Sequence, residues 1–69
     1  MNARQSVEVN QQMLQYLFDS AKKLAESKGI SIAESIDYKV SVHEKYSNTA
    51  NEATAWYLRG EEAKKMISL

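Results

Sequence analysis

The chain has 69 residues and a mass of 7.8 kDa, which is enough for one domain. It contains no cysteine, so disulfides and thiolate chemistry are excluded, and it has no proline and only two glycines, a composition typical of long helices. Nine basic and nine acidic residues are interspersed along the chain and leave no net charge. The lack of a positive surplus disfavours nucleic-acid binding without excluding it.

Two further expectations concern location and assembly. No stretch reaches the roughly 18 apolar residues of a membrane span, and residues 1–5 lack the apolar core of a signal peptide. We therefore expect a cytoplasmic protein that makes no membrane contact. Below about 70 to 80 residues one hydrophobic core gives only a few kcal/mol of net stability. A chain with neither disulfide nor metal is therefore expected to form a homodimer or a larger homo-oligomer.

The first segment predicts an amphipathic helix over residues 8–28. Its apolar residues fall on two adjacent stripes at helical spacing and together cover about half of the circumference. These residues are Val9, Met13, Leu14, Tyr16, Leu17, Phe18, Ala21, Leu24 and Ala25. Gly29 is expected to end the helix as a left-handed cap. An apolar arc this wide exceeds what one partner helix covers, which indicates contact with two further helices or with a second subunit.

The second segment predicts a helix over residues 31–46. Ser31 and Glu34 have the spacing of a capping box, in which side chains accept hydrogen bonds from free backbone N–H groups of the first turn. The expected core face is Ile32, Ala33, Ile36, Val40 and His43. Residues 36–42 also alternate between apolar and polar side chains, as on a half-buried strand. Helix is the favoured interpretation, because the cap signal is good and no turn residue follows before Lys45.

The third segment predicts a helix over residues 49–67, because Thr49 and Glu52 repeat the capping-box spacing. Its expected core face is Thr49, Ala53, Trp56, Tyr57, Gly60, Ala63 and Ile67. The residues expected mostly away from that face are Arg59, Glu62, Lys65 and Met66. Glycine inside a helix costs about 1 kcal/mol relative to alanine, so we expect a backbone or bulky side chain close to Gly60. The three segments together predict an all-α, compact three-helix bundle that pairs with a second copy.

The chain carries no arrangement typical of an enzyme. His43 is the only histidine, and the serines lie at cap, turn or helix-surface positions rather than in a strand-turn-helix elbow. No spacing of histidine and carboxylate residues fits a metal site, and two glycines cannot form a phosphate-binding loop. We therefore expect no catalysis, no cofactor and no metal. On the helical interpretation His43 lies on the apolar face and is expected to be a core or interface residue.

The remaining signal is apolar and aromatic surface of the type that binds proteins. Tyr38, Val42 and Tyr46 form a stripe nearly opposite to the core face of the second helix. With Trp56 and Tyr57 of the third helix, they are expected to bind a protein partner of unknown identity. For Trp56 by itself the favoured interpretation is that it fills the centre of a small core. The favoured function is a non-enzymatic protein-interaction module that acts as an intracellular adaptor, inhibitor or regulator.

A different function is implied by a resemblance in the first two thirds of the chain. Residues 6–10, with the sequence Ser-Val-Glu-Val-Asn, are similar to the short strand and N-cap of ribbon-helix-helix repressors. Residues 29–31, together with Glu34 and Ile36, are similar to the turn between the two helices of that family. The resemblance covers about residues 4–42.

This resemblance implies a dimeric DNA-binding transcriptional regulator with a short N-terminal strand over residues 4–10. Arg4, Ser6 and Glu8 would then face the major groove of DNA, where the carboxylate of Glu8 would repel phosphate. The predicted first helix is also about one turn longer than in that family. Both departures count against the implied function.

Helix-turn-helix regulators give a second form of the DNA-binding alternative. The small residue, the turn glycine and the following apolar residue of that motif are matched by Ala25, Gly29 and Ile30. The helix over residues 31–46, with Lys39, would then approach DNA. The buried positions of the motif would fall on Ser35 and Tyr38, so the match is partial.

Overall fold

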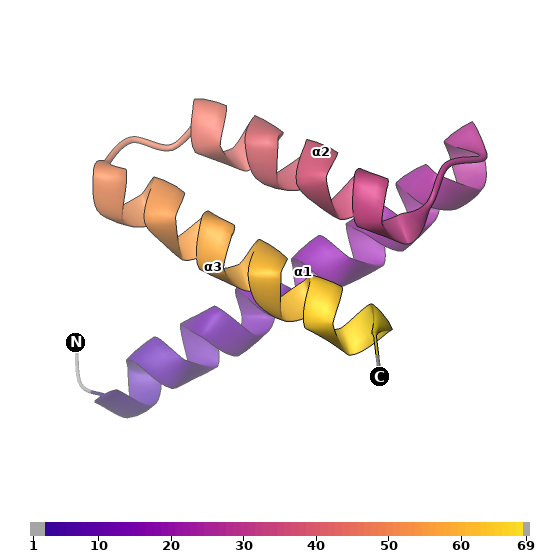
Figure 1. Cartoon of the computed structure of the whole chain (residues 1–69). Helices are drawn as coiled ribbons and strands as arrows, with labels where there is room; N and C mark the ends of the chain where they lie inside the picture. Colours follow the sequence, from indigo (N-terminus) through magenta and orange to yellow (C-terminus); the bar gives the residue numbers. More distant parts are fainter. Residues whose placement is uncertain (1–2, 69) are drawn as a thin grey trace.

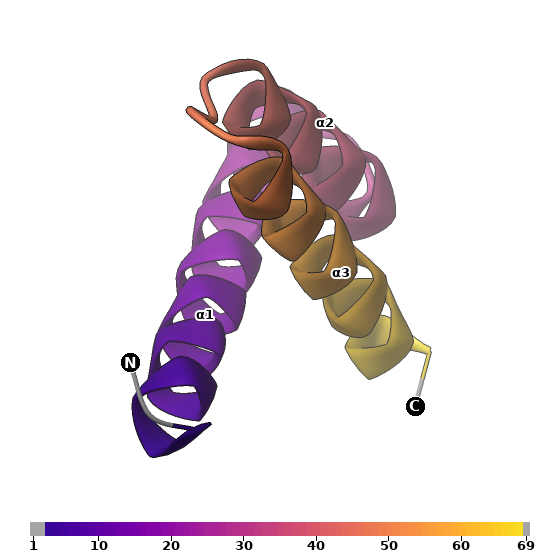
Figure 2. The same cartoon turned by 90° about the vertical axis from the view of Figure 1, so that its left-hand side faces the viewer.

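The computed structural model describes the backbone of residues 3–68 and the side chains of residues 9–68. This part of the chain forms three helices: α1 (Ala3–Lys28), α2 (Ile32–Lys45) and α3 (Ala50–Ile67). Figure 1 shows that α2 and α3 run antiparallel as a hairpin and that α1 crosses behind them. Seen from the side in Figure 2, α1 and α3 diverge towards the two chain ends. The all-α class and the three-helix bundle are therefore confirmed.

Residues 36–42 are helical, so the strand considered for them is wrong. The cap explains how the helix begins, because the Glu34 backbone N–H donates to the Ser31 hydroxyl over 3.1 Å. Tertiary packing then selects the helical period, because Ile36 and Val40, four residues apart, are both buried on one face. A strand would place these two residues on the same face as Tyr38, which is exposed in the helix.

The other helix ends also follow the expected local signals. The backbone N–H of Glu52 donates to the Thr49 hydroxyl over 3.1 Å, and the Glu52 carboxylate in turn accepts from the backbone N–H of Asn48. Gly29 has a φ of 68° and donates its N–H to the Ala25 carbonyl, as expected of a left-handed cap. The caps at Ser31 and Thr49 precede the first helical residues, which explains the one-residue difference from the expected starts.

The helix α1 begins at Ala3, five residues before the expected start at residue 8. A strand exists only when it pairs with another strand, so the strand considered for residues 4–10 would need a second copy of the chain. A single chain does not test that arrangement, and the N-terminal strand stays a prediction.

The core lies where all three helices meet. Its buried residues are Leu17 and Ala21 of α1, Ile36 and Val40 of α2, and Ala63 of α3. Partly buried residues that pack against them are Leu14, Phe18, Ile32 and Trp56. The structure therefore supports the favoured interpretation for Trp56, in which it packs on the core.

Gly60 lies where α3 packs closely on α2. A Cβ atom built on this glycine would lie 2.5 Å from Cγ2 of Val40, which is too close for two carbon atoms of different residues. The predicted packing reason for Gly60 is therefore confirmed, and the neighbour is the side chain of Val40. The missing side chain lets the two helix axes come together above the core.

The buried face of α3 differs from the expected one. Arg59, expected to face away, is 8% exposed, whereas Tyr57 and Ile67, expected in the core, are exposed. The reason is that α3 packs on two helices, so its buried arc runs from Gly60, which faces α2, to Arg59, which lies beside Leu14 of α1. The same geometry leaves Val9 and Tyr16 of α1 and Ala33 of α2 outside the core.

Candidate interaction surface

Of the five residues predicted to bind a partner, three are exposed and two are half-buried. Tyr38, Tyr46 and Tyr57 are exposed by 58%, 73% and 53%. Val42 and Trp56 are half-buried. Trp56 packs on the core and on His43. Because Trp56 and Tyr57 are about 100° apart around α3, the two aromatic rings point in different directions.

One aromatic cluster joins all three helices. The ring of His43 in α2 stacks on Trp56 of α3 with centroids 3.7 Å apart and planes at 9°. Tyr16 of α1 meets the same imidazole edge-on at 5.8 Å. Burial, and next the positive charge of Lys39, lower the pKa of His43 below its ordinary value. Its position between two aromatic rings and beside Lys39 therefore favours the neutral form of the imidazole.

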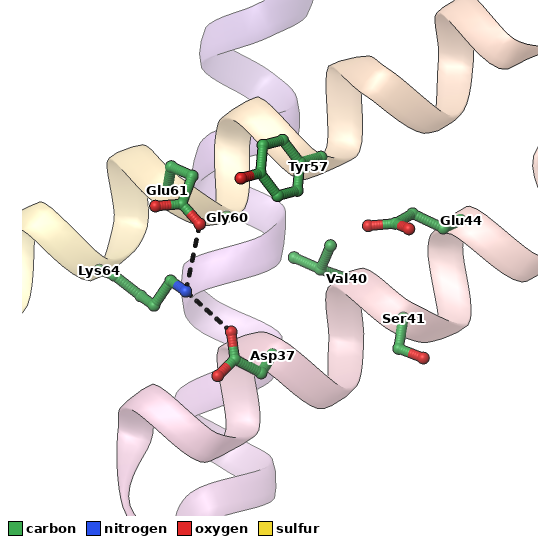
Figure 3. A pocket seen from close by; sticks show the side chains of 8 residues that line it. All are labelled: Asp37, Val40, Ser41, Glu44, Tyr57, Gly60, Glu61 and Lys64. Atoms are coloured by element: carbon green, nitrogen blue, oxygen red, sulfur yellow. Dashed lines mark hydrogen bonds and ion pairs between the residues drawn. The ribbon is translucent and has the colours of Figure 1, made fainter.

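A polar groove of about 230 Å³ runs between α2 and α3 on the side of Tyr57. Figure 3 shows Lys64 reaching between two carboxylates, with its Nζ 3.0 Å from Asp37 and 3.2 Å from Glu61. The hydrogen bond to Asp37, and to a smaller extent the hydrogen bond to Glu61, raise the pKa of Lys64. Exposed ion pairs of this kind contribute about 0 to 1 kcal/mol. Their role here is to link the two helices of the hairpin at the surface.

A second groove, of about 370 Å³, lies between the diverging parts of α1 and α3 and is mainly apolar. We call it the α1–α3 groove. Its lining residues are Gln11, Leu14, Gln15, Phe18 and Asp19 of α1 and Met66 of α3. Leu14, Phe18 and Met66 provide apolar contact surface, and the glutamines and the aspartate provide a polar rim.

The sequence pattern indicates the α1 side of the α1–α3 groove but not the α3 side. The apolar arc of α1 is wider than one partner helix can cover, and Leu14 and Phe18 lie at one edge of it. Met66, by contrast, was expected mostly away from the core face, and it is 47% exposed. Its position beside Phe18, 48 residues earlier, depends on how α3 crosses α1, which no local pattern encodes.

A smaller hollow, which shares Gln11 and Leu14 with the α1–α3 groove, contains Arg59. The guanidinium of Arg59 donates from Nη2 to the Glu62 carboxylate over 2.7 Å. Its Nε is buried and has no acceptor among the residues that the structure describes. Arg59 as a whole is 8% exposed, so this charged side chain is buried beside the hollow.

Of the residues expected to face DNA in the DNA-binding alternative, only Lys39 has a described side chain. Lys39 is half-buried on α2, near His43. The side chains of Arg4 and Ser6 lie outside the described residues. Of the positions that a helix-turn-helix would bury, Ser35 is buried and donates to the Ser31 carbonyl, whereas Tyr38 is exposed.

The chain was compared with family models, with curated proteins and with solved structures, and none of them matches it. Within residues 3–68, no helix has the length and apolar character needed to cross a membrane. Among the described side chains, no three histidine, aspartate or glutamate residues gather closely enough to hold a metal ion.

Proposed function

We propose that the protein is a small non-enzymatic interaction module, an adaptor, inhibitor or regulator, whose α1–α3 groove binds an apolar helical face. The observation that carries this proposal is the groove itself, in which Leu14, Phe18 and Met66 leave apolar surface open between two helices. Two diverging helices form the type of groove into which a third amphipathic helix packs. The polar rim, with Gln15 and Asp19, supplies hydrogen-bonding groups that can set the orientation of the bound helix.

A site-specific photo-crosslinking experiment tests this proposal. A photoreactive phenylalanine analogue replaces Gln15, which is exposed at the groove, in cells that produce the protein. The matched control replaces Lys23, an exposed residue of the same helix that is outside the groove. The expected result is a discrete covalent adduct from position 15 and none from position 23, with the adduct lost when Met66→Glu is added.

Two outcomes would contradict the proposal. One is the absence of any adduct specific to position 15. The other is steeply salt-dependent binding of the purified chain to duplex DNA that is lost on Lys39→Glu and kept on Met66→Glu. The second outcome would favour a dimeric DNA-binding regulator of the ribbon-helix-helix or helix-turn-helix type.

A further inference from the structure

The single chain exposes more surface than a folded monomer of its size. Its accessible surface is 5078 Å², whereas a monomeric protein of 7.8 kDa is expected to expose about 4,400 Å². The difference of about 700 Å² is close to the roughly 800 Å² that each partner buries in a standard protein–protein interface. The Cα radius of gyration, 12.2 Å, also exceeds the roughly 11 Å expected for this length.

The shape of the molecule explains this surplus. The principal extents are 40 × 27 × 16 Å, and the smallest extent corresponds to two layers of helices packed about 8 to 10 Å apart. Figure 2 shows the α2–α3 hairpin as one layer and α1 as the other, with the N-terminal part of α1 leaving the hairpin. Two thin layers enclose little volume, so a large share of the apolar side chains remains at the edge of the core.

The buried core is correspondingly small. Six apolar side chains are buried among the described residues, and three of them are alanines. Leu17 and Ile36 are the only large apolar side chains among them that are completely buried. A core of this size supplies only a few kcal/mol, and the described residues hold no disulfide that could add to it. Permanent coverage of the α1–α3 groove would therefore add stability that the single chain lacks.

We infer that the α1–α3 groove is covered by a second copy of this chain, in a twofold symmetric dimer. This inference rests on the proposed function and names the partner. A permanent partner is most often another copy, and closed twofold dimers are the commonest arrangement. The chain has no net charge, so long-range repulsion does not oppose the approach of two copies. Around a twofold axis each copy supplies both Met66 and the Leu14–Phe18 surface, so the two grooves close together.

The oligomeric mass of the purified full chain, measured from micromolar to millimolar concentration, tests this inference. The wild-type chain is expected to have about twice the single-chain mass of 7.8 kDa. Met66→Glu places a charge in the groove and is expected to raise the dimer dissociation constant about tenfold or more. The matched control is Leu58→Glu, because Leu58 is on the same helix, is 46% exposed and is outside the groove. This control is expected to dimerise as the wild type does.

A second variant separates loss of association from loss of folding. Gln15→Arg changes an exposed rim residue that takes no part in the core, and its long side chain obstructs the groove. It is expected to weaken the dimer to a similar degree while the helical circular dichroism of the monomer is retained. A monomeric wild-type chain at all concentrations would overturn the inference, and so would equal dissociation of the Met66→Glu and Leu58→Glu variants.

The crosslinking and mass measurements together distinguish failure of the dimer inference from failure of the proposed function. If the purified chain is monomeric and the photo-crosslink from position 15 joins it to a different protein, the inference fails and the proposed function stands. If the crosslink joins two copies of this chain and Met66→Glu abolishes it, both stand. If position 15 gives no adduct and the chain is monomeric, both fail.

Discussion

Val40 and Gly60 are the residues on which the close packing of α2 and α3 depends. A methyl group at position 60 would collide with Val40, whose branched side chain has little rotational freedom in a helix. Gly60→Ala is therefore expected to lower the free energy of unfolding by about 1 to 2 kcal/mol, because overpacking outweighs the gain in helix propensity. Urea denaturation followed by helical circular dichroism measures this change.

The effect of the contact with Val40 can be separated from the effect of helix propensity by shortening the side chain at position 40. When Val40→Ala removes the γ-methyl groups, Gly60→Ala in that background is expected to stabilise the protein by up to about 1 kcal/mol, since only the helix propensity remains. The same sign in both backgrounds would show that the close contact with Val40 does not set the helix spacing.

His43 should make stability depend on pH. Its pKa is lowered by burial and by Lys39, so near pH 6.5 the unfolded chain binds more protons than the folded chain. The contribution of the neutral His43 side chain to the free energy of unfolding is therefore complete above about pH 6.5 and is lost as the pH falls below that value. Unfolding followed by the fluorescence of Trp56, the only tryptophan, is expected to show this loss. His43→Phe keeps a ring against Trp56 and should remove the dependence between pH 5 and 7, while Lys39→Met should weaken it.

At the residue scale, the sequence predicted the close packing at Gly60 but not the burial of Arg59. Gly60 could be singled out because a glycine inside a helix needs a compensating contact. Arg59 was expected away from the core face because of its position in the helical pattern, yet it is 8% exposed and its Nη2 donates to Glu62. Helical spacing relative to one core face therefore does not place a residue of α3, because this helix packs on two neighbours.

At the scale of the elements, the caps determine where α2 and α3 begin. Thr49→Ala removes the acceptor for the Glu52 backbone N–H and is expected to lower stability by about 1 kcal/mol. Thr54→Ala, at an exposed position inside the same helix, is the control and should be neutral or slightly stabilising, because alanine is the better helix former. Thermal and urea denaturation of both variants give the comparison, and equal losses would show that the cap is not the cause.

The helices were predictable from the sequence because their signals are local. Ser31, Thr49 and Gly29 act within four residues of their own position, so the chain order of residue types reveals them. The α1–α3 groove was not predictable in the same way. It depends on the angle at which α3 crosses α1, and that angle follows from packing between Ala63, Leu17 and their neighbours, far apart in the sequence.

At the scale of the whole molecule, stability and association should be linked. If the second copy covers the α1–α3 groove, the midpoint of thermal unfolding is expected to rise with protein concentration, because mass action favours the folded dimer. Met66→Glu should make the midpoint independent of concentration, and Leu58→Glu should leave the dependence as it is. Differential scanning calorimetry over a wide concentration range makes the measurement, and a constant midpoint for the wild type would contradict the linkage.

The hairpin arrangement of α2 and α3 has a consequence for how the chain reaches its native state. These helices follow one another in the sequence, and Val40 and Gly60, which hold them together, are only twenty positions apart. Contacts at such short separations form within microseconds to milliseconds. Docking of α1 on the hairpin adds a slower unimolecular step. If two copies associate as inferred above, their meeting adds a bimolecular step whose rate depends on dilution. Refolding kinetics should therefore resolve a fast phase that is insensitive to dilution and a later phase that slows as the solution is diluted.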